Sequence, residues 1–134
     1  MTAVAFLLDT DICIYALKQH PGVLARLLAT SRPEVAVSVI TEGELRTGAA
    51  KSAHPARTLR LLESFLAPIT VLDFVSEDAV AYAHVRAKLE RSGTPIGPHD
   101  TLIASQAVAR GLVLVTNNER ELGRIGVKLD NWAA

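Results

Sequence analysis

The chain has 134 residues, 49% of them hydrophobic and 21% charged, which fits one compact globular domain with a real core. Its formal net charge at pH 7 is zero, so no overall positive field attracts nucleic acid, and an anionic ligand needs a local site. Cys13 is the single cysteine, which excludes an internal disulfide and a cysteine-based zinc cluster.

The same features set expectations for the cellular setting. A lone cysteine fits a reducing cytoplasm. The opening apolar run carries no early basic residue and is interrupted by Asp9 and Asp11, so neither a signal peptide nor a membrane span is expected. We expect a single domain over residues 1–134.

The first half of the chain alternates apolar runs with segments of helical spacing. Residues 3–8 are continuously apolar, which predicts a strand buried on both faces, followed by a helix. Pro21 is typical of the first turn of a second helix. A second strand is predicted at 35–40, then a helix that starts at Thr41 and ends near Gly48.

The second half continues this alternation. The expected elements are a leucine-rich helix broken by Pro68, a strand at 69–74, a helix capped by Ser76 and running to Ser92, a helix from Pro98 to Arg110, and strands at 112–116 and 127–129. Strands that alternate with helices indicate an α/β fold with a central, mainly parallel sheet of four or five strands covered on both faces. Ligands in such folds bind at the carboxyl ends of the strands.

Asp9 and Asp11 stand where the first strand ends. One interpretation is that they cap the next helix and complement its dipole, a role worth ~0.5–2 kcal/mol. The alternative is that the strand end holds a metal ion, because two acids this close do not both need to be caps. The sequence around them leaves both interpretations open.

Glu44 also has two interpretations. Thr41 followed by Glu44 forms a capping box, in which the glutamate reaches back to a backbone N–H. Glu44 is also one helical turn after Ile40, which places it along the face that packs on the sheet.

Asp100 is the most informative acid. It lies one turn before Ile103 and Ala104, at the head of the predicted buried stripe of its helix. A carboxylate there is costly to desolvate unless it is paired or bound to metal, so a functional role is favoured. After the fourth strand, Thr116 and Asn118 are candidates either for helix capping or for polar contacts at the same edge of the sheet.

Three carboxylates from distant segments, Asp9, Glu44 and Asp100, are thus predicted at one edge of one sheet. Such hard oxygen ligands suit Mg²⁺ or Mn²⁺ rather than zinc. Mg²⁺ keeps several waters and binds phosphate, so the natural chemistry is hydrolysis of a phosphodiester by activated water.

The segments "LLDTDICIYALK", "AVSVITEGELRTGAAKS", "VRAKLERSGTPIGPHDTLIASQA" and "LVLVTNNERELGRI" resemble the VapC toxins of bacterial toxin–antitoxin pairs, which are PIN-domain ribonucleases. The resemblance covers nearly the whole chain. "TPIGPHDTLIA" and "LVTNNERE" are similar to the subgroup that cleaves initiator tRNA in the anticodon loop. The resemblance implies a PIN-type three-layer α/β/α domain.

It also implies roles for the polar residues. Asp9 and Asp100 would be the principal Mg²⁺ ligands, and Glu44 the third acid, with Thr116 orienting a water or phosphate. Asn118 stands where the family usually has a fourth acid, for which Glu119 or Glu121 would compensate. The family's usual DTN is here DTD, so Asp11 replaces an asparagine that steadies the site.

The resemblance further implies an RNA substrate, a cognate VapB-type antitoxin and a homodimer. Cleavage would leave a 5′-phosphate and a 3′-hydroxyl. Candidates for contacts with the RNA backbone are Arg46, Lys51, Arg86 and Arg120. None of the four histidines is expected to be needed, and His99 is expected at the edge of the pocket.

Two alternatives remain. "LLDTD" also resembles the DxD motif of haloacid-dehalogenase-type phosphatases, in which the first aspartate is a covalent nucleophile and the second a general acid. The chain could also be a toxin-fold interaction protein that has lost activity through Asn118.

Overall fold

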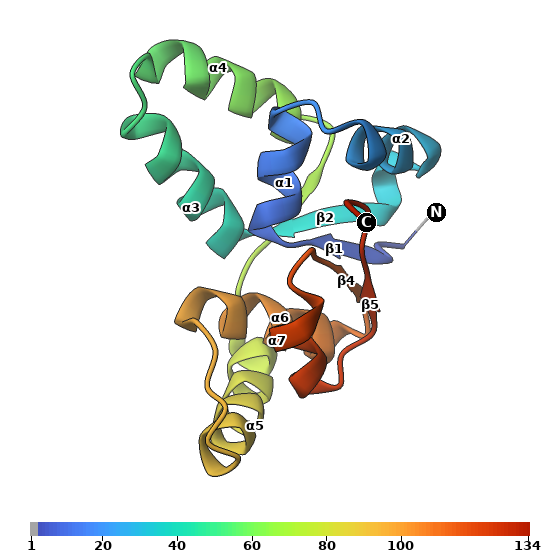
Figure 1. Ribbon diagram of the computed structural model, residues 1–134, viewed down its shortest axis with the longest axis vertical. Coiled ribbons are helices and arrows are strands. Elements are labelled where there is room, and N and C mark those ends of the chain that lie inside the picture. Colours follow the sequence, from blue (N-terminus) through green and yellow to red (C-terminus); the bar gives the residue numbers. More distant parts are fainter. Residues whose placement is uncertain (1–2) are drawn as a thin grey trace.

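The computed structural model describes residues 3–134 and shows a central sheet between two layers of helices (Figure 1). All strand pairs are parallel, and the strand order is β3-β2-β1-β4-β5. The strands are β1 (Phe6–Leu8), β2 (Val35–Ser38), β3 (Thr70–Leu72), β4 (Val113–Val115) and β5 (Leu129–Asp130). The predicted α/β fold with a parallel sheet is confirmed.

One layer contains α1 (Thr10–Leu17), α2 (Pro21–Ala29), α3 (Val39–Ala50) and α4 (Pro55–Leu66). The other contains α5 (Ser76–Arg91), α6 (Pro98–Arg110) and α7 (Glu119–Leu122) (Figure 1). Short 3₁₀ turns are η1 (Arg32–Glu34) and η2 (Gly123–Ile125). No helix within residues 3–134 combines the length and apolar character needed to span a bilayer.

The apolar strands bury both faces, because successive side chains of a strand point to opposite sides of the sheet. Leu8 packs into the core beneath α1, α2 and α4, whereas its neighbour Leu7 packs into the core beneath α5 and α6. Both side chains are fully buried. The continuous apolar run thus reports a central strand of a three-layer fold, as predicted.

Two predicted boundaries of α3 are wrong. The hydroxyl of Ser38 accepts a hydrogen bond from the Ile40 N–H at 3.1 Å, so Ser38 is the N-cap and the strand ends there rather than at residue 40. Thr41 is therefore a buried residue inside the helix, and it forms no capping box with Glu44. The helix also runs past Gly48 to Ala50.

The predicted capping residue of α5 is wrong, whereas the predicted ends of α6 agree with the structure. Val75, not Ser76, is the residue before α5, and its N–H donates to the Asp78 carboxylate at 2.9 Å. The prediction for α6 is confirmed at both ends. Pro98 occupies its first turn, and Gly111 follows it in the left-handed conformation (φ 65°) that glycine adopts without strain.

The topology of the sheet places the carboxyl ends of β1 and β4 side by side. From β1 the chain builds the sheet outward on one side through β2 and β3, and later on the other side through β4 and β5. β1 and β4 are neighbours with Leu8 opposite Val115, so the next residues, Asp9 and Thr116, lie side by side. This is the switch point of the sheet, where open parallel sheets bind ligands.

Candidate active site

Asp9 is held at the carboxyl end of β1 by two hydrogen bonds. One carboxylate oxygen accepts from the Thr10 N–H at 2.8 Å, and the other accepts from the Thr116 hydroxyl at 2.9 Å. The Thr116 oxygen in turn accepts from the Asn118 N–H at 3.0 Å. Asp9 thus does cap α1, and the same cap fixes it in the site, so the two interpretations of this residue are compatible.

The charge on Asp9 is poorly compensated. Only 3% of the residue is exposed, and burial raises the pKa of its carboxyl to about 7. The neighbouring charge of Asp11 and, more weakly, that of Asp100 also raise this pKa, while the Thr116 hydrogen bond lowers it. Asp9 is therefore an acid that the folded chain makes difficult to ionise without a cation.

Asp11 lies in the first turn of α1, two residues after Asp9. One of its carboxylate oxygens accepts from the Asn117 N–H at 3.1 Å. The other, Oδ1, is buried and has no hydrogen-bond partner within the described residues. Burial is also the main reason that the pKa of Asp11 is raised. A lone pair left without a donor in this position is open to an external ligand.

Glu44 reaches the site from α3, and both of its oxygens are bonded. Oε1 accepts from the Thr10 hydroxyl at 2.6 Å, and Oε2 lies 3.1 Å from Nδ1 of His99. These partners come from the first turn of α1 and from the first turn of α6. The tertiary fold, rather than a capping box, accounts for its orientation.

Asp100 lies half-buried in the first turn of α6. Burial raises the pKa of its carboxyl, and the charges of Glu44, Asp11 and Glu121 raise it further, with His99 acting in the opposite direction. Within residues 3–134 no group donates a hydrogen bond to this carboxylate. Asp100 is therefore within electrostatic reach of the other acids and free to take a ligand.

The structure tests one of the two roles predicted for Asn118, the capping of α7. Its side chain does not cap α7, and instead its amide donates to Glu121 at 3.1 Å. Glu121 is thereby directed toward the same region, because its charge contributes to the raised pKa of Asp100. Glu119 accepts a hydrogen bond from the Asn131 amide at 3.1 Å. Of the two acids that were expected to compensate for Asn118, Glu121 is the one near the site.

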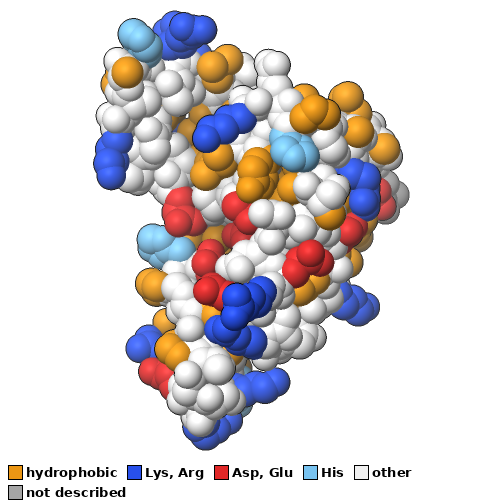
Figure 2. Space-filling model, viewed as in Figure 1, with side chains coloured by type: hydrophobic (Ala, Val, Ile, Leu, Met, Phe, Trp, Pro, Cys, Tyr) orange, Lys and Arg blue, Asp and Glu red, His pale blue; other side chains and the backbone are white. Residues whose placement is uncertain are grey.

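The acidic side chains gather at the waist of the molecule, between the two helical layers (Figure 2). They do not form a closed cage: within residues 3–134 no three His, Cys, Asp or Glu side chains converge into a ready-made metal site. That Asp9, Glu44 and Asp100 bind one ion stays a prediction: the charge of Asp100 acts on Asp9, and that of Glu44 acts on Asp100. The oxygens of Asp9 and Glu44 are held by hydroxyl, N–H and imidazole groups.

The donor set nonetheless fits a hard divalent cation. It consists of carboxylate oxygens, one of which, on Asp11, is buried without a partner. No Lys or Arg within the described part of the chain forms a salt bridge with Asp9, Asp11 or Asp100. Because Mg²⁺ takes one or two carboxylates and keeps several waters, it does not require a closed cage of protein ligands.

Three of the four basic candidates are exposed on α3, directly after it, or on α7. Arg46 is paired with Glu42 on the exposed side of α3, and Lys51 is exposed at the end of that helix. Arg120 is exposed on α7. None of these three contacts the acids, so any role of theirs concerns a larger ligand.

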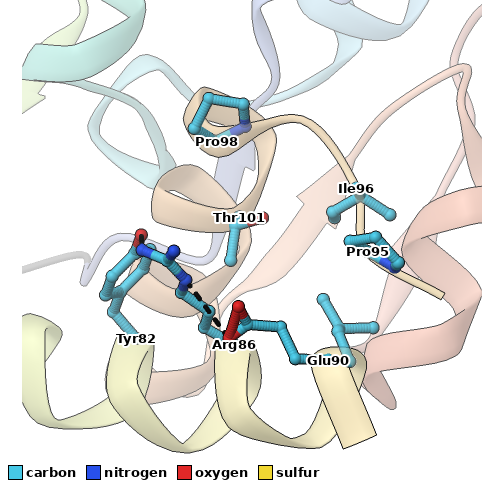
Figure 3. A pocket seen from close by; sticks show the side chains of 8 residues that line it. Tyr82, Arg86, Glu90, Pro95, Ile96, Pro98 and Thr101 are labelled. Carbon is cyan, nitrogen blue, oxygen red and sulfur yellow. Dashed lines mark hydrogen bonds and ion pairs between the residues drawn. The ribbon is translucent and has the colours of Figure 1, made fainter. Parts of the chain in front are cut away.

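Arg86 lies on α5 in the wall of a cavity of about 210 Å³ (Figure 3). Its guanidinium donates to the Tyr82 hydroxyl at 3.0 Å and pairs with Glu90 at 3.5 Å. Pro98 and Thr101 of α6 line the same cavity. This pocket therefore adjoins the helical turn that carries Asp100.

The contacts that two polar residues make with Glu44 were not predicted from the sequence. The bond from Thr10 to Glu44 was not predicted, because a threonine between two acids at the start of a helix is also typical of a helix cap. His99 was expected only at the pocket edge, although its place directly before Asp100 was a signal that it would be near the acids. Their contacts with Glu44 span 34 and 55 residues of chain, which no local pattern reports.

Comparison with known proteins gives a consistent result. The profile of the PIN domain matches residues 6–128. The tRNA(fMet)-specific endonuclease VapC of Salmonella typhimurium is 41% identical over 128 residues, covering 95% of this chain and 97% of that protein. Ribonuclease VapC2 of Haemophilus influenzae is 38% identical with the same coverage.

Solved structures agree with the sequence matches. The DNA-bound VapBC structure from Salmonella typhimurium contains a chain with a TM-score of 0.92 and 40% identity, covering 96% of this chain and 98% of that chain. VapBC2 from Rickettsia felis, bound to a DNA fragment from the promoter, gives a TM-score of 0.89 at 36% identity, covering 96% and 99%. Both the fold and the order of the elements thus match a known family.

Proposed function

The chain belongs to the PIN-domain family as a VapC-type ribonuclease toxin, and we propose that it is a Mg²⁺-dependent endoribonuclease that cuts tRNA in the anticodon loop. The observation that carries the proposal is the buried Asp9, next to Asp11 and near Asp100, at the carboxyl edge of β1 and β4. This negative charge has no cationic partner from the described chain.

Each acid has a proposed part in catalysis. Asp9 and Asp100 would hold Mg²⁺, or Mn²⁺ in its place, with Glu44 acting on its water ligands. Bound there, the ion supplies stabilisation of charge on the phosphodiester and activation of a water for attack. Thr116 fixes one oxygen of Asp9 through its hydroxyl, and the N–H of Asn118 fixes Thr116. The products would carry a 5′-phosphate and a 3′-hydroxyl.

The substrate proposal draws on two supports. Relatives from Salmonella typhimurium and Shigella flexneri, about 40% identical over nearly the full chain, are named tRNA(fMet)-specific endonucleases. Because the net charge is zero, RNA needs local cations, and Arg46, Lys51, Arg86 and Arg120 are proposed to contact its backbone. An RNA substrate would place the activity in the cytoplasm.

A VapB-type antitoxin is the proposed partner, since the matching solved structures are VapBC complexes. An apolar groove of about 370 Å³ runs between α1, α3 and α4 and offers a place for it. Ile14 and Leu61 are exposed in this groove, and Glu44 borders it. A segment docked there would lie against the active site and could block it. A homodimer is proposed as the assembly.

The family assignment removes the support for a haloacid-dehalogenase-type phosphatase. Such an enzyme uses the first aspartate as a covalent nucleophile and needs a later acidic pair at a strand end. The later acid, Asp100, lies at the head of a helix rather than at a strand end.

The test is cleavage of initiator tRNA by the purified protein in Mg²⁺, in Mn²⁺ and in EDTA. Asp100→Asn removes a proposed ligand, and Asp73→Asn, at an exposed acid away from the site, is the matched control. We expect metal-dependent cleavage that Asp100→Asn removes and Asp73→Asn retains. Full activity of the Asp100→Asn protein would contradict the proposal, and inactivity of the wild type on every RNA tested would favour a non-catalytic interaction protein.

A further inference from the structure

His99 is the one imidazole in contact with the acidic site among the described residues. Its Nδ1 lies 3.1 Å from Oε2 of Glu44, while the Thr10 hydroxyl donates to Oε1 at 2.6 Å. We propose that His99 is a positioning residue that acts with Thr10 to hold the Glu44 carboxylate toward the proposed metal site. This inference rests on the proposed function and assigns a role to a residue outside the acidic set.

The Thr10 side of this arrangement has a defined hydrogen-bond direction. A threonine hydroxyl has one proton, and the short contact with Glu44 uses it. The contact of 3.0 Å between the hydroxyls of Thr10 and Thr41 must then be donated by Thr41, which is fully buried. A chain of donors thus runs from Thr41 through Thr10 to Oε1 of Glu44, and each bond polarises the next.

One hydrogen bond does not fix a glutamate. Its side chain has three rotatable bonds, so a carboxylate held at Oε1 alone can still swing its other oxygen. His99 removes this freedom, because it bonds Oε2 from α6, which belongs to the other helical layer. Two donors from two helices therefore determine the plane of the carboxylate.

The held carboxylate keeps its capacity to act. Each carboxylate oxygen has two lone pairs, so an oxygen that accepts from Thr10 or His99 can also accept from a water. Glu44 would then act on the waters around the ion, as the proposed function assigns it. Its effect on those waters would depend on the orientation of its carboxylate. Partners that orient ligand groups typically change metal affinity or activity by 10–100-fold.

A different role for His99 makes a different prediction. The side chain is 59% exposed, so the imidazole could instead contact a phosphate of the RNA. Loss of such a contact would raise KM for RNA and leave metal affinity unchanged. Loss of a positioning contact would weaken metal binding in the absence of RNA.

The experiment compares His99→Ala, His99→Asn and His84→Ala. Asparagine can place an amide N–H near the position of Nδ1, so it can restore the bond to Glu44, whereas alanine cannot. His84 is an exposed histidine on α5 and serves as the control. The readouts are Mn²⁺ and Mg²⁺ affinity by calorimetry without RNA, and kcat and KM for tRNA cleavage.

We expect His99→Ala to weaken metal binding about tenfold and to lower kcat with little change in KM. His99→Asn should recover most of both, and His84→Ala should match the wild type. Unchanged metal affinity in His99→Ala, or equal losses in the Ala and Asn variants, would overturn the inference while leaving the proposed function intact. A wild-type protein that binds neither metal would overturn both.

Discussion

Asp9 and Asp78 are two almost fully buried acids, 3% and 1% exposed, whose surroundings treat their charge in opposite ways. Asp78 accepts hydrogen bonds from the Val75 N–H and from the Arg110 guanidinium, which pairs with it at 2.9 Å. Burial raises the pKa of Asp78, but the hydrogen bonds from Arg110 and Val75 outweigh it and lower the pKa overall. Asp9 has hydroxyl and N–H donors but no cation, and its pKa rises to about 7.

The difference between Asp78 and Asp9 distinguishes a buried charge that stabilises the fold from one that is available to bind a ligand. A buried charge persists only if it is paired, hydrogen-bonded or bound to metal. Asp78 is satisfied within the chain and fastens α5 to α6, the helix that carries Asp100. Asp9 and Asp11 are left short of positive charge at a strand edge, where a ligand can supply it. The following substitutions test this division.

Asp9→Asn should give the largest effect. It removes a proposed metal ligand while its amide oxygen can still accept from the Thr10 N–H. We expect tRNA cleavage to fall at least about a hundredfold, since a metal ion contributes several kcal/mol of charge stabilisation. Unfolding in EDTA should show no loss of stability. A variant that remained active, or that unfolded, would assign Asp9 to the structural class.

Arg110→Met should behave in the opposite way. It leaves the Asp78 charge buried without its partner, and breaking a buried ion pair typically costs 3–5 kcal/mol. Because the Arg110 side chain is 30% exposed, we expect a smaller loss of about 2–3 kcal/mol in the free energy of unfolding. Denaturant titration measures it. Metal affinity per folded molecule should be unchanged, and a large loss of affinity would show that the two regions are coupled.

Asp11→Asn should have a smaller effect of opposite sign. It removes a charge that helps to raise the pKa of Asp9, and it replaces the unpartnered buried oxygen with an uncharged amide group. We expect the metal-free protein to gain about 1 kcal/mol of stability at neutral pH, measured by denaturation in EDTA. Affinity for Mg²⁺ should fall. A simultaneous gain in metal affinity would show that Asp11 hinders the site rather than completes it.

The pH dependence of stability should distinguish the two acids by sign. The pKa of Asp78 is lowered on folding, so its contribution is present above about pH 4 and is lost as the pH falls below that. The pKa of Asp9 is raised, so metal-free protein should lose stability as the pH rises from about 4 to about 7. Unfolding curves of Asp9→Asn and Asp78→Asn in EDTA should each lack one of these slopes.

The sequence predicted the elements better than the contacts between them. The helix from Pro98 to Arg110 was found at both ends, because Pro98 and Gly111 constrain the backbone locally. The start of α3 was missed, because Ser38 lies within an apolar run and its capping role depends on where β2 leaves the sheet. A local sequence pattern indicates the backbone conformation that the residues prefer. It does not indicate the residue at which a strand leaves the sheet.

The candidate site shows the same limit. Asp9 and Thr116 were placed correctly at one edge of a parallel sheet, because topology alone brings the ends of β1 and β4 together. The bonds from Thr10 and His99 to Glu44 were not predicted, since each requires the packing of α3 against another helix.

The most direct test of the central claim is thermal unfolding with and without Mg²⁺ or Mn²⁺, in the absence of RNA. A ligand that binds only the folded state at a hundred times its Kd adds about 2.7 kcal/mol of stability. We predict a concentration-dependent rise in Tm for the wild type and for Asp78→Asn, and none for Asp9→Asn or Asp100→Asn. No rise in the wild type, or an equal rise in the Asp9 and Asp100 variants, would contradict a cation site at these acids.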